Sequence, residues 1–413
     1  MAQRAGCARR RGGVWPGRRV VPALATVRRM DFELPADDDP RRLSVRSWLA
    51  EHPSPGDREV ADAGYVAPHW PAPYGLDADP IHQIIIDDEL RRAKVRRPDN
   101  MIGIGWAGPT LLEAGTPEQQ QRYLPRLLSA EDLWCQLFSE PGAGSDLANL
   151  GTRAVRDGDE WVVNGQKIWT SFGHVARYGI LIARTDPDVP KHKGITYFVC
   201  PMDAQGIEVR PIIEMTGGHT FNEVFFTDVR IPHENVVGDV NDGWRLAKVT
   251  LANERVSLSS GGALWGAGPA AGDLLDLVRS RGGVDDPIMR QELAGLWTEA
   301  EILRLIRLRT VTAAIKGRQP GPEASIRKIL ADEHGQRIMG LAKDLSGAGG
   351  MLTDGGPLGS DAALWHFGYL FAQALTIGGG TGDVQRNIVA ERVLGLPHDI
   401  DAEVGRTWAE SRR

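Results

Sequence analysis

Residues 136–146 read QLFSEPGAGSD, and residues 166–171 read QKIWTS. A glycine-rich loop of this kind is, by itself, usually nothing more than a loop. Here it stands at the start of a stretch rich in β-branched and aromatic residues, in which Asn164-Gly165 separates two short apolar runs. Because Asn-Gly supplies the positive φ of a tight turn, residues 161–169 predict a β-hairpin.

Further β-rich runs follow the expected hairpin. They are separated by glycine, proline and aspartate, which are typical of turns. The runs are residues 178–183, 194–200 and 222–226. Short strands with turn signals between them predict a small β-barrel or β-sandwich domain over residues 134–240.

Helical periodicity flanks this β-rich stretch on both sides. Apolar residues recur at spacings of three and four, which is typical of amphipathic helices. The expected helices are residues 81–96 and 117–129 before the β-rich stretch, and residues 288–315, 324–345, 362–375 and 383–394 after it. The helices that follow the β-rich stretch are numerous enough for a bundle.

The order helix, strand, helix predicts an α+β protein with three domains. We expect an N-terminal helical domain at residues 30–133, a small middle β domain at 134–240, a C-terminal four-helix bundle at 241–400 and a tail at 401–413. A dinucleotide-binding Rossmann unit is not expected, because no GxGxxG stands between a predicted strand and a predicted helix.

The composition argues against several classes of function. The net charge of −6 gives no support to nucleic-acid binding. No run of about 18 apolar residues exists, so no membrane span is expected. Cys7, Cys135 and Cys200 lack the spacing of a disulfide framework or a zinc site, and the histidines show no HExxH pattern. We expect no metal ion and, from reduced thiols, a cytoplasmic protein.

Residues 1–29 form a basic leader with eight arginines and no acidic residue. Such a leader can be a targeting segment, but its apolar run at residues 20–25 is short and Pro22 interrupts it. We expect a disordered leader. Whether it belongs to the working protein, or whether the working protein starts at Met30, stays open.

The two stretches at residues 136–146 and 166–171 together suit a flavin. A flavin needs a flat apolar wall for its ring, hydroxyl or amide donors for its polar edge, and glycines that let the backbone approach it. Trp169, the hydroxyl of Ser171 and the glycines of the first stretch supply such groups.

Several motifs, in this order along the chain, resemble those of the acyl-CoA dehydrogenases. They read SEPGAGSD at 139–146, NGQKIWTS at 164–171, FNEVFFTDVRIPHENVVG at 221–238, GWRLAKVTLANER at 243–255 and GGGTGDVQRNIVAERVLG at 378–395. The resemblance extends from about Asp31 to His398. The LANER and GGGT forms are most similar to the bacterial branch that oxidises bulky or branched acyl-CoAs.

The resemblance implies noncovalently bound FAD and assigns residues to its ring. Phe138 and Ser139 are expected to line the pyrimidine edge of the flavin, with Gln136 nearby. Trp169 is expected to cover one face of the ring, and Ser171 to donate a hydrogen bond to flavin N5.

The resemblance also assigns residues to the ends of the cofactor. Gly144 and Ser145 are expected where the flavin meets the pantetheine of the substrate. Thr381 and Asp383 match positions that contact the FAD of a neighbouring subunit, although Asp383 replaces the usual Gln or Glu. Many relatives also carry an RxxFG stretch whose arginine reaches that FAD. Residues 279–283 read RSRGG here, so either arginine of this stretch is a candidate.

The catalytic base departs from the commoner pattern of the family. The best-known members place a glutamate where this chain has Gly379. A minority places the base immediately before the arginine of the motif LANER, which is Glu254 here. We therefore expect Glu254 to remove the α-proton and the backbone N–H of Gly379 to bind the thioester oxygen. Arg255 either orients this base, touches the substrate or forms a structural ion pair.

The resemblance implies a dehydrogenase that converts an acyl-CoA into a 2-enoyl-CoA and passes electrons to an acceptor of the electron-transfer flavoprotein type. A tetramer is expected, either of identical chains or with a related chain. An alternative is a non-catalytic FAD-binding partner subunit, which the missing carboxylate at Gly379 favours. A nitroalkane oxidase is disfavoured because it needs an Asp base, and a DNA-associated repair homologue because the chain beyond the leader is acidic.

Overall fold

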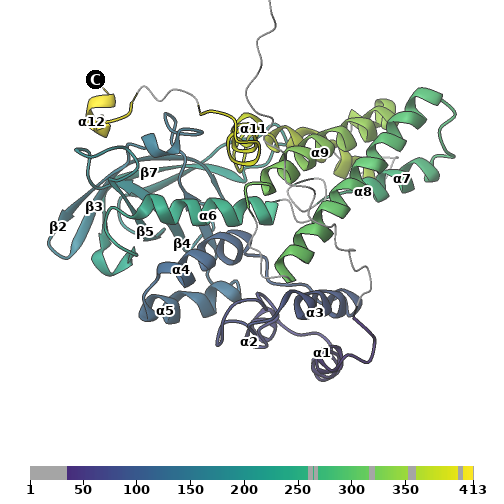
Figure 1. The fold of residues 1–413 in the computed structure, drawn as a ribbon, viewed down its shortest axis with the longest axis horizontal. Helices are drawn as coiled ribbons and strands as arrows, with labels where there is room; N and C mark the ends of the chain where they lie inside the picture. The colour runs from purple at the N-terminus through teal and green to yellow at the C-terminus, as the bar shows by residue number, and fades with distance from the viewer. Residues whose placement is uncertain are drawn as a thin grey trace, which may run out of the picture. The chain divides into compact units, whose positions relative to one another are not determined.

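The computed structural model describes residues 35–258, 264, 268–315, 321–351, 360–398 and 403–412 (Figure 1). The expected basic leader at residues 1–29 and the alternative start at Met30 lie outside these residues. Within the described ranges, helices come first, then a sheet, then helices again. This order confirms the α+β layout that the sequence predicts.

The N-terminal helices begin where local chemistry favours a helix start. They are α1 (Pro40–Glu51), α2 (Asp57–Asp62), α3 (Pro80–Arg92), the π-helical turn η1 (Gly103–Ala107), α4 (Gly108–Ala114) and α5 (Pro117–Leu128). The side chains of Asp39, Asp79 and Thr116 each accept a hydrogen bond from a backbone N–H in the first turn of α1, α3 and α5. Proline follows each of these caps, where its missing N–H leaves no bond unmade.

The middle part of the described chain forms an eight-stranded sheet. Its strands are β1 (Trp134–Leu137), β2 (Arg153–Asp157), β3 (Glu160–Ser171), β4 (Tyr178–Arg184), β5 (Ile195–Pro201), β6 (Ile207–Pro211), β7 (Phe221–Pro232) and β8 (Val236–Val237). The order is β6-β7-β3-β2-β4-β5-β8, with β1 paired in parallel to β4. The β-rich runs predicted from the sequence fall in these strands, except that Gly194 lies just before β5.

The hairpin predicted around Asn164-Gly165 is wrong. β3 continues through both residues, and the turn lies at Gly158, between β2 and β3. Asn164 instead exchanges hydrogen bonds of 2.9 Å with Asp228 on β7, at a register shift of the two strands. A Cβ on Gly165 would stand 2.7 Å from the Cα of Thr152, so glycine here permits a close approach of two chain segments. Long-range pairing with β7 overrides the local turn signal.

Both faces of the sheet are covered by apolar side chains. Successive residues of a strand point to opposite faces. On β4, Ile180 and Ile182 join the core that includes the N-terminal helices, whereas Leu181 and Ala183 join a second core on the other face. The first core also contains Leu246 of α6, so this core links α6 to the sheet and to the N-terminal helices.

The C-terminal part of the described chain is helical. It comprises α6 (Gly243–Leu258), α7 (Ala271–Ser280), α8 (Pro287–Ile315), α9 (Ala324–Ser346), η4 (Gly347–Met351), α10 (Ser360–Phe371), η5 (Ala372–Ala374), α11 (Gly382–Ile388), η6 (Val389–Val393) and α12 (Trp408–Ser411). α7, α8, α9 and α10 pack around a core of their own that includes Leu296, Ile338 and Trp365. α9 also contacts α6, which carries Glu254, and α11, which carries Asp383 and follows directly on Gly379 and Thr381.

The described residues include neither a candidate membrane span nor a candidate metal site. None of the described helices has both the length and the apolar character needed to cross a membrane. No group of three or more metal-ligating side chains in the described ranges has the geometry to hold a metal ion. Cys135 and Cys200 are buried free thiols.

Candidate functional site

A buried ion pair joins the glycine-rich loop to strand β3. Lys167 Nζ lies 2.8 Å from Glu140 Oε1 and donates a second hydrogen bond of 2.9 Å to the carbonyl oxygen of Phe138. Glu140 also accepts hydrogen bonds from the backbone N–H groups of Gly151 at 2.7 Å and Thr152 at 2.9 Å. One carboxylate therefore holds both ends of the loop against β3.

The environment favours the charged form of Glu140. Burial by itself raises the pKa of the Glu140 carboxyl, but the charge and hydrogen bond of Lys167, together with the bonds from Thr152 and Gly151, outweigh burial and lower that pKa. Burial lowers the pKa of Lys167, and the carboxylate of Glu140 opposes this change. Sequence reasoning did not single out Lys167, although the lysine of the QKIWTS stretch is the signal that could have found it.

Trp169 is held in an unusual backbone conformation at the end of β3. Its φ is 62°, in the left-handed region that a bulky residue rarely adopts. An extra residue enters β3 here, between Lys167 and Thr170, so the strand bulges. The bulge turns the indole outward, where 58% of the residue is exposed, with Phe221 edge-on at 6.1 Å between ring centroids.

The remaining predicted ring residues lie around this bulge. The backbone N–H of Ile168 donates to the carbonyl oxygen of Ser139 at 2.9 Å, which ties the first motif to the second. Phe138 is buried beside Tyr197. Ser171 is the last residue of β3 and pairs with Phe221.

These features suit a flat ligand with polar edges. The exposed indole of Trp169 is planar, and the hydroxyl of Ser171 follows it at the end of the strand. A Cβ added at Gly142 or Gly144 would meet no atom of the described chain within 4 Å. No described side chain therefore covers the backbone at these two glycines, and a cofactor or substrate could approach it closely.

Glu254 lies on α6 with only 6% of the residue exposed. Gln136 Nε2 on β1 donates a hydrogen bond of 3.3 Å to Glu254 Oε2. One helical turn earlier, Thr250 Oγ1 lies 2.8 Å from Thr110 Oγ1 and 3.0 Å from the hydroxyl of Tyr197. Residues four apart share a helix face, so this hydroxyl cluster fixes the same face of α6 that carries Glu254. Arg255 follows on the same helix.

The glycine turn before α11 is held by Gln385. Gly379 and Gly380 have φ values of 67° and 89°, which favour glycine. The buried amide of Gln385 donates to the carbonyl oxygens of Gly379 at 3.1 Å and Gly380 at 3.4 Å. Thr381 caps α11 by accepting a hydrogen bond from the N–H of Val384 at 3.3 Å. Sequence reasoning missed Gln385, and no pattern in the sequence signals its role.

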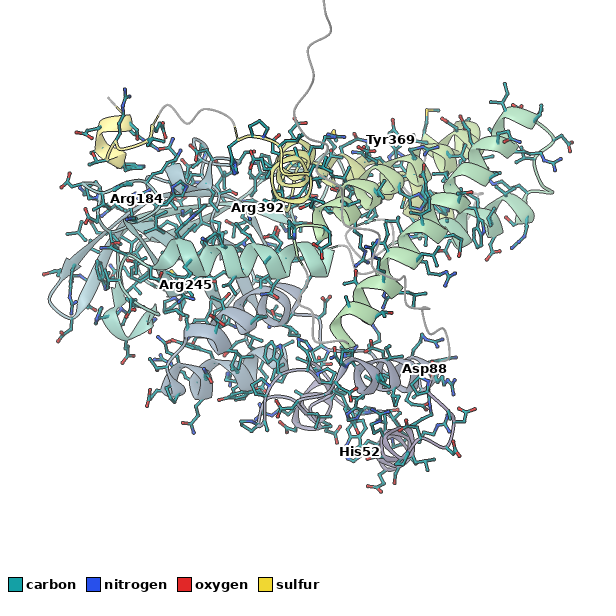
Figure 2. The ribbon with its side chains drawn as sticks, in the orientation of Figure 1. His52, Asp88, Arg184, Arg245, Tyr369 and Arg392 are labelled. Carbon is teal, nitrogen blue, oxygen red and sulfur yellow. The ribbon has the colours of Figure 1, made fainter. Side chains whose placement is uncertain are left out.

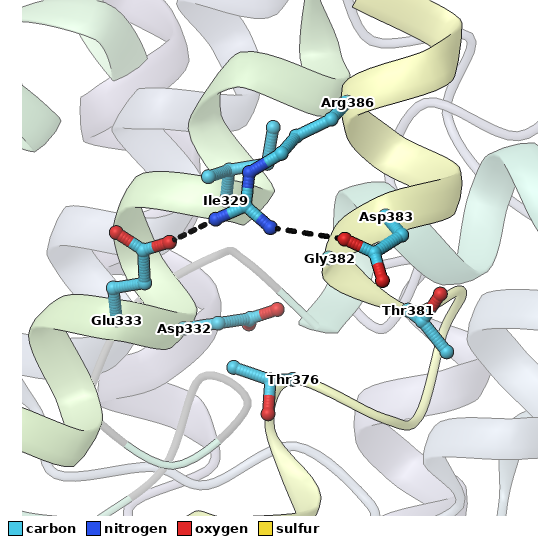
Figure 3. Close-up of a pocket in the computed structure, with 8 residues that line it drawn as sticks. All are labelled: Ile329, Asp332, Glu333, Thr376, Thr381, Gly382, Asp383 and Arg386. Atoms are coloured by element: carbon cyan, nitrogen blue, oxygen red, sulfur yellow. Dashed lines mark hydrogen bonds and ion pairs between the residues drawn. The ribbon is translucent and has the colours of Figure 1, made fainter.

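A pocket of about 230 Å³ lies between α9 and α11 (Figure 3). It is lined by Ile329, Asp332, Glu333, Thr376, Thr381, Gly382, Asp383 and Arg386. Figure 3 shows Arg386 between two carboxylates, with Nη2 2.7 Å from Glu333 Oε1 and Nη1 3.4 Å from Asp383 Oδ1. The side chain of Asp383 is 94% exposed, so it faces outward where a second chain or a ligand can reach it.

The structure gathers the predicted residues into three groups. Gln136 meets Glu254, the ring residues surround the bulge in β3, and the residues before and within α11 surround Gln385 and the pocket. Of the two arginines at residues 279–283, Arg281 donates to the carbonyl oxygen of Leu345 at 2.6 Å at the end of α9, and Arg279 pairs with Asp276 at 2.8 Å.

Family comparisons cover most of the chain. Residues 43–131 match the model of the acyl-CoA dehydrogenase N-terminal domain, residues 135–229 match that of the middle domain, and residues 241–394 match that of the C-terminal domain.

Curated and solved relatives agree with these matches. The chain is 48% identical over 339 residues to acyl-CoA dehydrogenase FadE34 of Mycobacterium tuberculosis, an alignment that covers 82% of this chain but only 45% of that longer protein. It is 31% identical to the solved Tcur3481-Tcur3483 steroid ACAD, with a TM-score of 0.75 and coverage of 90% and 100% of the two chains. It is 32% identical to a chain of the ChsE4-ChsE5 complex from Mycobacterium tuberculosis, with a TM-score of 0.72 and the same coverage.

Proposed function

The chain belongs to the acyl-CoA dehydrogenase family, and from that premise we propose that it is an FAD-dependent dehydrogenase that converts an acyl-CoA into a 2-enoyl-CoA. The observation that carries this proposal is the contact between Gln136 and Glu254. It holds a buried carboxylate beside the strand that leads into the flavin motif. We also assign the protein to the cytoplasm.

The proposed FAD would be held by residues from both halves of the chain. Phe138, Ser139 and Gln136 would meet the polar edge of the ring, Trp169 its face and Ser171 its N5. Gly144 would lie beside the flavin, and Thr381 and Asp383 would contact the FAD of a neighbouring subunit. The exposed indole at the bulge and the open backbone at Gly144 support this arrangement. Bound FAD supplies the acceptor for the hydride that leaves the β-carbon of the substrate.

Glu254 is the proposed base. Its carboxylate takes the α-proton of the acyl chain, while Gln136 keeps the side chain aimed by its hydrogen bond. Thr250 and its two hydroxyl partners prevent α6 from shifting, which preserves the distance between base and substrate. Arg255 and Ser145 are proposed contacts of the substrate.

Gly379 is proposed to donate its backbone N–H to the thioester oxygen, where negative charge develops as the α-proton leaves. The bond from Gln385 to the carbonyl oxygen of Gly379 supports this role, since it fixes the turn that presents the N–H. A glycine in place of the commoner glutamate loses a carboxylate but keeps this donor.

The substrate is proposed to be bulky, such as a branched or sterol-derived thioester. The similarity to the Tcur3481-Tcur3483 steroid ACAD supports this class. Residues 378–380 are all glycine, so no side chain fills the space beside the reacting carbons. The alternative, that these glycines only permit the turn, predicts no preference for bulky substrates.

We propose a tetramer that passes its electrons to an acceptor of the electron-transfer flavoprotein type. Thr381 and Asp383 make sense as residues that serve a neighbour's FAD only if chains associate. The similarity to a chain of the ChsE4-ChsE5 complex supports assembly with a related chain, and a homotetramer is the other possibility.

The second candidate function is a non-catalytic FAD-binding subunit that completes the site of a related chain. Gly379 favours it, because the commoner base position is empty. Anaerobic titration of the purified, flavin-loaded protein with short, long, branched and sterol-derived acyl-CoAs decides between the two. Bleaching of the flavin absorbance by any of them supports the dehydrogenase. A flavin that stays oxidised with all of them supports the silent subunit, and a protein that never takes up FAD overturns both.

A further inference from the structure

The last described residues, 403–412, belong to the expected C-terminal tail, and they pack back against the sheet and its loops. In Figure 1, α12 lies beside the strands of the sheet, although more than 200 positions of the chain separate Trp408 from Arg184 of β4, which it contacts. The N–H of Trp408 donates to the carbonyl oxygen of Val189 at 2.9 Å, and the N–H of Ala409 to that of Pro187 at 3.0 Å. Thr407 caps this short turn through a capping box with Glu410.

Trp408 covers a buried arginine. Arg184 of β4, labelled in Figure 2, is 2% exposed, and its guanidinium carbon lies 5.0 Å from the centre of the Trp408 ring. Burial, followed by the charge of Arg412, lowers the pKa of Arg184 to about 10. A cation over an indole face is stabilised although water is excluded, so Trp408 seals a charge that would otherwise be costly to bury.

Arg184 in turn holds the segment that follows the glycine-rich motif. Its guanidinium donates hydrogen bonds to the carbonyl oxygens of Ala148 at 2.6 Å and Leu150 at 3.4 Å, and to that of Lys191 at 2.7 Å. It therefore ties the turn at residues 147–150 to the connection between β4 and β5.

The tail also contacts this turn directly. The indole N–H of Trp408 donates to the carbonyl oxygen of Asn149 at 3.4 Å, and Arg412 Nε donates to the side-chain oxygen of Asn149 at 3.3 Å. Lys191 Nζ bridges the two segments, at 3.0 Å from Asp146 Oδ2 and 2.8 Å from Glu403 Oε2.

Gly144 and Ser145 lie between two held points of the same loop. On one side, Ala143 exchanges backbone hydrogen bonds of 3.0 and 3.1 Å with Glu140. On the other, Asp146 and Asn149 are held by Lys191 and by the tail. Both Gly144 and Ser145 are exposed, so the contacts at either end, and not burial, determine where they stand.

We propose that residues 403–412 act as a strap that positions the loop of Gly144 and Ser145, and that Trp408 is its positioning residue. The inference rests on the proposed function in one respect: these two residues are where the flavin and the pantetheine of the substrate are expected to meet. Trp408 acts through the loop and is not itself among the residues expected to contact the flavin or the pantetheine. Its loss is therefore expected to weaken the binding of FAD and acyl-CoA and to leave the chemical step intact.

Trp408→Ala and Trp408→Phe in the full-length chain test the strap, with Arg406→Ala as a control from an exposed position of the same segment. Loss of the indole contacts is expected to raise the Kd of the apoprotein for FAD and the KM for acyl-CoA by about 10-fold. The rate of flavin reduction at saturating substrate is expected to stay within about twofold of the wild-type rate, because an interaction that stabilises the ground state and the transition state equally does not change this rate. Trp408→Phe keeps an aromatic face over Arg184 and is expected to retain most of the affinity.

Hydrogen exchange on the FAD-free protein separates the strap from the proposed function. In Trp408→Ala, amides at residues 141–151 are expected to exchange faster, while those of α9 and of β5 keep their wild-type protection. Faster exchange in that loop supports the strap even if the wild type binds no flavin. Absence of flavin binding would contradict the proposed function but not the strap. The strap is overturned if amides at residues 141–151 exchange in Trp408→Ala as they do in the wild type. It is also overturned if the wild type binds FAD and Trp408→Ala has the same Kd for FAD and the same KM for acyl-CoA. Equal effects of Arg406→Ala would overturn it too.

Discussion

Gln136 donates a hydrogen bond of 3.3 Å to the carboxylate of Glu254, and the two residues are 118 positions apart in the chain. The sequence motifs assign them different tasks: Gln136 belongs to the edge of the proposed flavin, and Glu254 is the proposed base. The side-chain amide of Gln136 thus connects β1, which leads into the cofactor motif, to α6, which carries the proposed base.

Glu254→Gln keeps the shape of the side chain and removes its ability to take a proton. We expect the variant to bind FAD and acyl-CoA as the wild type does, and to reduce the flavin roughly 10²–10⁴-fold more slowly, the usual contribution of a positioned base. Stopped-flow absorbance under anaerobic conditions measures this rate. Glu292→Gln, at an exposed position of α8, is the control. Reduction at nearly the wild-type rate would show that another group is the base.

Gln136→Leu removes the hydrogen-bond donor that reaches Glu254. A bond to a charged group is worth about 1.5–3 kcal/mol, so flavin reduction is expected to slow by roughly 10–100-fold. Gln136→Glu, which places a second carboxylate beside the first, should be slower still at neutral pH. Flavin reduction at the wild-type rate in both variants would contradict a contact between the two side chains.

Lys167→Met leaves the carboxylate of Glu140 buried without its cation. Breaking a buried pair in this way costs about 3–5 kcal/mol, which urea unfolding can measure as a lower free energy of unfolding. The double variant Lys167→Met with Glu140→Gln is the matched control, since it leaves no buried charge and should recover part of the loss. If the single and double variants are equally stable, the pair does not hold the loop.

Asp332 predicts a dependence of stability on pH. Burial raises its pKa to about 6, against partial opposition from Lys328, compared with 3.8 for an ordinary Asp. A group with a raised pKa contributes stability that is fully present below the unfolded value of 3.8 and is lost as the pH rises through about 6. Asp332→Asn should remove this contribution, at most about 3 kcal/mol. The free energy of unfolding at about pH 4.5 and about pH 7 measures it. Asp276→Asn, at an exposed site on α7, should keep the wild-type difference.

Gly379→Ala tests the proposed N–H donor. Its φ of 67° is strained for any residue with a Cβ, at a cost of about 1–2 kcal/mol. We expect the turn to shift, flavin reduction to slow and FAD to stay bound. Gly395→Ala is a matched control, because Gly395 has a φ of 70° and stands outside the proposed site. Equal losses of activity in both variants would mean that strain alone, and not the donor, explains the result.

Local chemistry in the sequence determined where most elements lie. Capping residues and prolines set the starts of α3 and α5, and apolar periodicity predicted α8 and α9 nearly to their ends. These features depend on residues within a few positions of one another, which a sequence displays directly. The family motifs likewise predicted a base on the helix that is now α6.

Tertiary contacts decided what local patterns could not. Asn164-Gly165 reads as a turn, but pairing of β3 with β7 keeps the strand extended through it. The bonds of Gln136 with Glu254 and of Trp408 with Asn149 join residues 118 and 259 positions apart. Whether such residues meet depends on the packing of the whole sheet against α6 and the tail, to which each local stretch contributes only a small part of the free energy. The sequence motifs thus predict which types of residue the proposed site contains, whereas the tertiary structure determines which side chains contact one another.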